Sequence, residues 1–194
     1  NGGHSRVVQQ LARHKYNKIN IFDENNQSEE VVGNFEEMIN YNNLNNCDNF
    51  IAIGDNEIRE QKLKTLIDKN IKVTSLIDNG ALLANNIEIG KGSIVMPGCI
   101  INSNTKIGVG CIINTGSLID HDCKLNDYVH ISPGCKLGGT IVIGKLSWIG
   151  IGTTIINNIS IGDNVKIAAG STIYKDIRDR IKIIQKVEQQ EHSI

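Results

Sequence analysis

Two different periodicities predict two domains in this chain: a small Rossmann-like α/β domain over residues 1–78 and a parallel β-helix over residues 79–175. The first region alternates strand-like and helix-like segments, whereas the second repeats an aliphatic residue every six positions. A charged segment with scattered apolar residues, 176–194, follows both regions. We expect this segment to cap the β-helix, in helical form.

Overall composition narrows the class of protein. A formal net charge of -1 and an aromatic content of 4% disfavour nucleic-acid binding, which needs a basic stripe and stacking surfaces. No apolar run approaches the roughly 20 residues that a transmembrane helix needs, and the first residues lack the regions of a signal peptide. We therefore expect a soluble cytoplasmic protein with no membrane span and no nucleic-acid partner.

The first region reads as alternating strands and helices of ordinary length. Its predicted helices carry apolar residues on one face, and its predicted strands end in acids or glycine. Such alternation is typical of a small parallel α/β domain. Residues 2–16 are expected to form a turn that leads into a helix, further helices are expected over residues 34–44 and 56–70, and the expected strands cover residues 18–24, 49–56 and 71–77.

The second region is dominated by a six-residue repeat. From Ile89 to Ile173 every sixth residue is Ile, Leu or Val, and the fourth residue after each is small or β-branched. Repeats of this kind wind a chain into a three-sided coil with the aliphatic residue inside. Glycines that follow the aliphatic residue, such as Gly90 and Gly108, are expected where the chain bends.

The repeat also explains most of the cysteines. Four of the five, Cys99, Cys111, Cys123 and Cys135, occupy the small inward position. A zinc site would need close pairs such as CxxC, and the sequence contains none. We therefore expect these four thiols to pack in the core, as buried free cysteines usually do, and nothing marks Cys47 as reactive.

The motif Asp120-His121-Asp122 is the main candidate for chemistry. His121 follows the inward Ile119 by two positions, so its side chain should reach the outer surface at a corner of the coil. Flanking acids can hold an imidazole in one tautomer and raise its basicity, as general-base catalysis requires. The alternatives are a solvated polar turn and a metal site that combines His121, His130 and a carboxylate.

His130 lies nine residues after His121, which is half of an eighteen-residue coil. The two side chains should therefore point to opposite sides of one chain. A threefold trimer could place His121 of one subunit and His130 of its neighbour in the same cleft between subunits. The alternative is that His130 is an isolated surface histidine.

Three turns in the first region carry residues suited to nucleotide binding. A glycine turn opens the first predicted helix, where backbone N–H groups attract phosphate. Acids close the next strand, where Rossmann-like folds bind a ribose or a base. Each feature is common in ordinary turns, but together they predict a nucleotide site. The residues concerned are Gly2, Gly3, His4, Asp23, Glu24, Gly54, Asp55 and Asn56.

The order of motifs resembles a known family. The segments GGH, FDE and IAIGDNEIR, followed by NTGSLIDHDCKLNDYVHISPGCKLGG, resemble the sialic-acid O-acetyltransferase-like hexapeptide-repeat acyltransferases, closest to the UDP-4-amino-sugar N-acetyltransferases of bacillosamine and perosamine pathways. The resemblance covers residues 1 to about 175. It implies a left-handed parallel β-helix and a homotrimer. It also implies acetyl-CoA-dependent N-acetylation of a nucleotide-linked amino sugar in surface-glycan biosynthesis, without a metal.

The resemblance also implies roles for individual residues. His121 matches the general base, and Asp122 matches the acid that raises its basicity. The positions that match acetyl-CoA contacts are His130, Gly139, Ile151 and Ala169. The positions that match contacts to the nucleotide sugar are Gly3, His4, Ser5, Asp23, Glu24 and Gly54, with Asn114 near the acceptor amine. The backbone N–H of Gly139 is a candidate hydrogen-bond donor to the thioester carbonyl.

Two features depart from the family pattern. The family places a strand before the glycine turn, which is expected to be missing here, and no G-x-P-A turn follows the last coil, so the end of the CoA channel is expected to differ. Three other functions are compatible with the motifs. They are O-acetylation of a sugar hydroxyl (a sialic acid or a polysaccharide precursor), non-catalytic nucleotide-sugar binding by a trimer, and a metal-dependent lyase reaction.

Overall fold

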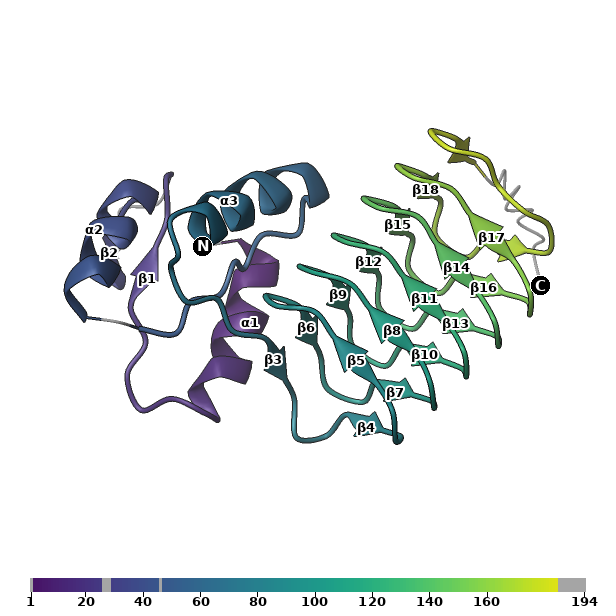
Figure 1. Ribbon diagram of the computed structural model, residues 1–194, viewed down its shortest axis with the longest axis horizontal. Helices are drawn as coiled ribbons and strands as arrows, with labels where there is room; N and C mark the ends of the chain where they lie inside the picture. Colours follow the sequence, from purple (N-terminus) through teal and green to yellow (C-terminus); the bar gives the residue numbers. More distant parts are fainter. Residues whose placement is uncertain (1, 26–28, 46, 185–194) are drawn as a thin grey trace, which may run out of the picture.

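A computed structural model describes residues 2–25, 29–45 and 47–184. It shows an N-terminal α/β region and a parallel β-solenoid of about six turns, of the left-handed β-helix type, whose coils stack away from that region (Figure 1). Both predicted architectures are therefore confirmed. The helices are α1 (Gly3–Arg13), α2 (Phe35–Asn45) and α3 (Asn56–Asp68).

The α/β region contains less sheet than the sequence predicts. Among its described residues, one pair of strands forms within it: β1 (Ile21–Phe22) and β2 (Val31–Gly33) run in parallel. The strand expected at 49–56 is reduced to an isolated bridge between Asn49 and Val73. This segment does not form a strand because its carbonyl groups have other partners. Those of Ile53 and Gly54 accept hydrogen bonds from an arginine side chain on α3 and not from a neighbouring strand.

The strands of the solenoid are two residues long and form three walls. Wall 1 contains β4 (Leu82–Leu83), β7 (Ile100–Ile101), β10 (Leu118–Ile119), β13 (Lys136–Leu137), β16 (Thr154–Ile155) and β19 (Thr172–Ile173). Wall 2 contains β5 (Glu88–Ile89), β8 (Lys106–Ile107), β11 (Lys124–Leu125), β14 (Val142–Ile143) and β17 (Ser160–Ile161). Wall 3 contains β3 (Leu76–Ile77), β6 (Ile94–Val95), β9 (Ile112–Ile113), β12 (His130–Ile131), β15 (Trp148–Ile149), β18 (Lys166–Ile167) and β20 (Lys182–Ile183).

The α/β region covers the outer face of the first coils of wall 3. The outward side chains of Ile94 and Ile112 are fully buried there. Apolar residues of α1, among them Val8 and Leu11, belong to the same cluster as the solenoid core. The segment expected as a strand at 71–77 is divided by this arrangement, because its last two residues form β3 and pair with β6 of the solenoid.

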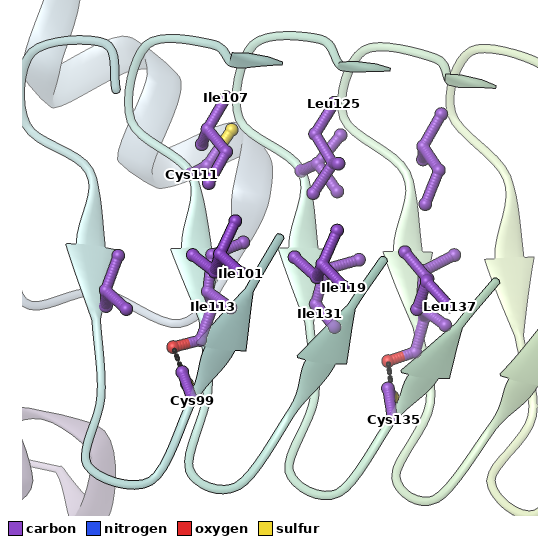
Figure 2. Close-up of a cluster of buried hydrophobic side chains, with 14 of the residues drawn as sticks. Cys99, Ile101, Ile107, Cys111, Ile113, Ile119, Leu125, Ile131, Cys135 and Leu137 are labelled. Carbon is purple, nitrogen blue, oxygen red and sulfur yellow. Dashed lines mark hydrogen bonds between the residues drawn. The ribbon is translucent and has the colours of Figure 1, made fainter. Parts of the chain in front are cut away.

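The solenoid interior confirms the expectation for the aliphatic residues and the cysteines. Side chains such as Ile101, Ile119 and Leu125 stack between the walls (Figure 2). The thiol of Cys99 donates to the carbonyl of Asn114 in the next coil at 3.1 Å, and the Ser117 hydroxyl makes the equivalent bond 15 residues ahead. Serine, threonine and cysteine therefore fill one structural position.

Two kinds of residue make the corners. Glycines directly after the aliphatic position allow close approach, because a Cβ on Gly90 would lie 2.5 Å from the Gly108 backbone. The bend itself comes two residues later, where the backbone has positive φ, for example 67° at Gly92 and 61° at Asn104. The sequence-based expectation that the bend lies at Gly90 and Gly108 is therefore wrong.

The final coil is shorter than the others. Ile167 pairs with Ile183, a separation of sixteen residues where earlier coils pair residues eighteen apart. Residues 176–184 form a turn and β20, so the expected helical cap is wrong for this part, and residues 185–194 lie outside the described residues. Among the residues that the structure describes, no helix has the length and apolar character to cross a membrane.

Candidate active site

His121 lies on the outer surface at the corner where β10 of wall 1 turns toward β11 of wall 2. Its side chain is 54% exposed, which agrees with the outward position expected from the repeat. The imidazole lies against the next coil, because a Cβ on Gly139 would fall 2.6 Å from the His121 ring. Only a glycine at position 139 leaves room for the ring in this orientation.

The two flanking acids act on His121 in different ways. The Nδ1 atom of His121 lies 2.8 Å from Oδ2 of Asp122. An ionised carboxylate only accepts hydrogen bonds, so in the neutral ring Nδ1 carries the proton and Nε2 keeps a free lone pair. Asp120 instead accepts the backbone N–H of His121 at 2.9 Å. The hydrogen bond to Asp122, followed by the charge of Asp120, raises the pKa of His121.

A second histidine cluster lies where α1 meets wall 3. The rings of His4 and His130 have centroids 6.2 Å apart, and the Asn114 side-chain amide lies 3.3 Å from Nε2 of His130. Burial, followed by the charge of Arg59, lowers the pKa of His130 to about 3 and that of His4 to about 4. Both rings are therefore neutral at physiological pH.

Arg59 connects this cluster to the solenoid. It is fully buried on α3, and its guanidinium donates to five acceptors, including the carbonyl groups of Gly54, Gly110 and Tyr128. The His130 ring also donates a hydrogen bond to the backbone carbonyl of Gly54, which acts against the lowering of the His130 pKa. Sequence reasoning missed Arg59, because an arginine in a polar helix is usually exposed.

The remaining predicted residues fall at several places. Ser5 lies on the first turn of α1 and accepts a hydrogen bond from Gln9. Glu24 pairs with Lys62 of α3 and lines a groove of about 620 Å³ between α2 and α3. Asp23 accepts the backbone N–H of Asn25. The positions at Gly3 and Gly54 are uncrowded, since a Cβ on Gly3 would meet nothing within 4 Å.

Ile151 and Ala169 lie on neither histidine site. They follow β15 and β18 in successive coils, at the corner between walls 3 and 1. Ile151 is 58% exposed, which is high for an isoleucine. The structure thus brings His121, Asp122 and Gly139 together at one corner, joins His4, Gly54, Asn114 and His130 at wall 3, and places Ile151 and Ala169 at another corner.

The described residues contain no cluster of three or more histidine, cysteine, aspartate or glutamate side chains arranged to hold a metal ion. His121 lies at the corner between walls 1 and 2 and His130 lies on wall 3, so the two are on different sides of the solenoid, as the spacing predicts. The four inward cysteines are buried, and burial raises the pKa of Cys111 to about 12 and that of Cys135 to about 11.

Comparisons with known proteins identify the group that shares these features. Residues 1–66 match the family described as the PglD N-terminal domain, and residues 140–175 match bacterial transferase hexapeptide (six repeats). The acetyltransferase domain of PglB from Neisseria gonorrhoeae, solved with acetyl coenzyme A, is 33% identical, with 93% of this chain and 91% of that chain covered and a TM-score of 0.88. The chain belongs to the amino-sugar acetyltransferase family.

A second solved member of this family is PerB from Caulobacter crescentus, in complex with CoA and GDP-perosamine. It is 29% identical, the similarity covers 93% of this chain and 89% of that chain, and the TM-score is 0.88. The family resemblance expected from the sequence motifs is therefore confirmed. The roles of individual residues in this acetyltransferase family member stay predictions.

Proposed function

We propose that this protein transfers an acetyl group from acetyl-CoA to the amine of a nucleotide-linked amino sugar. The observation that carries the proposal is the His121–Asp122 pair at an exposed corner, in which Asp122 contacts Nδ1 and leaves Nε2 of the neutral ring available to accept a proton. The family supports it, since PerB was solved with CoA and GDP-perosamine and the PglB domain with acetyl coenzyme A. The proposed product would serve surface-glycan biosynthesis in the cytoplasm.

In this proposal His121 acts as the general base. Its Nε2 accepts a proton from the attacking amine, and Asp122 stabilises the imidazolium that forms. The raised pKa of His121 makes Nε2 a stronger proton acceptor than a free imidazole. Acetyl-CoA supplies an already activated thioester, so positioning and one base are sufficient, with no metal and no covalent acyl-enzyme.

The buried cluster of His4 and His130 at wall 3 supports a binding role in the proposed reaction. His4 Nε2 is buried and has no hydrogen-bond partner within the described part of the chain, so it can accept or donate a bond to a substrate. Asn114 and His130 lie beside it. We propose that this cluster positions the acceptor amine and the thioester end, and that the uncrowded first turn of α1, with Gly3 and Ser5, binds the phosphates.

Other predicted contacts complete the proposal. The Cα of Gly139 faces the His121 ring, and the backbone N–H of Gly139 is the proposed donor to the thioester carbonyl. Ile151 and Ala169, stacked in successive coils, are the proposed lining of the CoA channel. Asp23 and Glu24 are the proposed contacts to the ribose or the base, and either uracil or guanine would suit them.

We further propose that the site is assembled in a homotrimer. The outer face of wall 1 presents an apolar ladder of Leu82, Ile100 and Leu118, of which Leu82 is 63% exposed. His121 lies at the edge of this ladder. Packing wall 1 of one subunit near wall 3 of the next would cover the ladder and bring His121 to the neighbour's His130. Such a head-to-tail contact closes into a ring when its rotation is threefold.

The proposal is tested by release of free CoA thiol from acetyl-CoA with UDP- and GDP-linked 4-amino sugars and with the matching 4-hydroxy sugars. Turnover with an amino sugar and none with its hydroxy analogue is expected. Turnover with the hydroxy sugar alone would establish an O-acetyltransferase. Binding without any turnover would contradict catalysis and favour a binding trimer, and activity that a chelator abolishes would contradict a metal-free reaction.

A further inference from the structure

Two asparagines in the preceding coil lie directly beneath the two acids that flank His121. The Nδ2 atom of Asn102 donates to Oδ1 of Asp120 at 2.8 Å, and that of Asn104 donates to Oδ1 of Asp122 at 3.1 Å. Each bond joins residues eighteen apart, which is one coil of the solenoid. The acids are therefore held from the coil below.

Only one of these two bonds continues to the imidazole. Asp122 uses Oδ1 for Asn104 and Oδ2 for His121, so its carboxylate connects the two side chains. Asp120 uses the same Oδ1 for Asn102 and for the backbone N–H of His121. Asn104 thus fixes the carboxylate that orients the ring, whereas Asn102 supports the turn.

We propose that Asn104 is a positioning residue for His121, acting through Asp122. The effect of Asn104 on catalysis rests on the proposed function. The contacts from Asn104 to Asp122 and from Asp122 to His121 do not depend on that function. Asn104 and Asp122 both occupy the left-handed region, with φ of 61° and 58°. Asparagine and aspartate tolerate that conformation better than most residues, so the corner can carry this pair without strain.

The neutral amide suits this task better than a cation would. A lysine or arginine beneath Asp122 would hold the carboxylate, but its positive charge would also oppose protonation of His121 nearby. The Asn104 amide fixes the carboxylate and adds no charge. The charged groups that act on His121 among the described residues are Asp120 and Asp122, and both favour its protonated form.

The test uses Asn104→Gly, because glycine accepts the positive φ and removes the side chain that carries the amide. Asn86→Gly is the matched control, since Asn86 has the same φ of 61° one coil below and its side chain has no acid partner among the described residues. Asn104→Asp is a second variant, because aspartate tolerates the backbone but cannot donate to Asp122. Circular dichroism first confirms that each variant folds.

We expect kcat for acetyl transfer to fall roughly 5- to 20-fold in Asn104→Gly and also to fall in Asn104→Asp, with KM for acetyl-CoA little changed, as loss of one charge-assisted hydrogen bond would cause. The pKa of His121, followed by NMR of the imidazole, should be lower in Asn104→Gly than in the unaltered protein, because Asp122 is then no longer fixed against the ring. The acid limb of its pH–kcat profile should move to lower pH in the same variant.

The NMR titration needs no turnover, so it separates the two proposals. If the unaltered protein fails to acetylate any amino sugar, the proposed function is wrong. The positioning role of Asn104 would still stand in that case if the pKa of His121 falls in Asn104→Gly. An unchanged His121 pKa in Asn104→Gly, or an equal change in Asn86→Gly, would overturn the inference. Full kcat in Asn104→Asp would overturn it as well.

Discussion

The outer corner at His121 and the buried cluster of His4 and His130 place the same side chain in opposite environments. His121 is exposed beside two carboxylates, which raise its pKa. His4 and His130 are largely buried near the guanidinium of Arg59, and their pKa values fall to about 4 and about 3. One chain thus makes one imidazole a stronger base and keeps two others neutral.

This difference separates a residue that can take up a proton from residues that can only bind and orient. A neutral buried imidazole still offers one donor and one acceptor. It gives a substrate amine directional contacts without repelling it when it carries positive charge. The proposed reaction needs both kinds of histidine, and the following predictions test the contrast, from the largest expected effect to the smallest.

Replacing His121 with alanine should lower turnover by roughly 10²–10⁴-fold, the usual contribution of a general base. Thermal stability should change little, because the side chain is exposed and, among the described residues, its ring makes one hydrogen bond, to Asp122. Steady-state rates and a thermal melt measure both effects. His14→Ala, at the C-terminal end of α1, is the control and should retain activity. Loss of the fold in His121→Ala would show that the histidine is structural.

Replacing Arg59 with methionine should lower the free energy of unfolding by about 3 kcal/mol, because it leaves several buried carbonyl groups without a donor. Chemical denaturation measures this loss. In the folded fraction the pKa values of His4 and His130 should rise, since the charge of Arg59 lowers both.

Arg59→Lys separates the two effects of this residue. Lysine keeps the charge but cannot reproduce the five hydrogen bonds of the guanidinium. Stability should therefore fall while the histidine pKa values stay low. If the pKa values of His4 and His130 remain unchanged in folded Arg59→Met, the charge of Arg59 does not lower them, and this part of the comparison is wrong.

Asp122→Asn removes the acid that acts most strongly on His121. Its pKa should fall, so the acid limb of the rate profile moves to lower pH, and kcat should drop roughly 10- to 100-fold because the ring loses its ionised partner. Rates between pH 5 and 9 measure both. Asp163→Asn is the control, since Asp163 accepts a backbone N–H at a different corner. An unshifted limb in Asp122→Asn would contradict the assigned pair.

The smallest effect is expected from Cys123→Ser, inside the wall next to His121. The thiol donates to the Gly138 carbonyl at 3.2 Å, and serine makes the equivalent bond at position 117. The free energy of unfolding should change by less than about 1 kcal/mol, and turnover should be unaffected. A large loss of activity with an intact fold would indicate a nucleophilic thiol and contradict the role given to His121.

The two regions also differ in how far the sequence predicted them. In the solenoid, a single six-residue period correctly placed Ile119 inside, Cys123 at the small inward position and His121 outside, because each coil repeats the same geometry. The Asn104–Asp122 contact could have been found the same way, since residues eighteen apart stack. In the α/β region the helices were predicted well, but the strand at 49–56 was not.

The sequence by itself therefore determined the periodic features of the protein, namely the solenoid, its core and the outward direction of His121. In the solenoid, local spacing alone decides which way each side chain points. The tertiary structure decided what depends on packing between the two regions. It buried Arg59, turned the carbonyl groups of Ile53 and Gly54 toward it, and brought His4 to His130. These contacts join segments with no fixed spacing, so only the folded chain could bring them together.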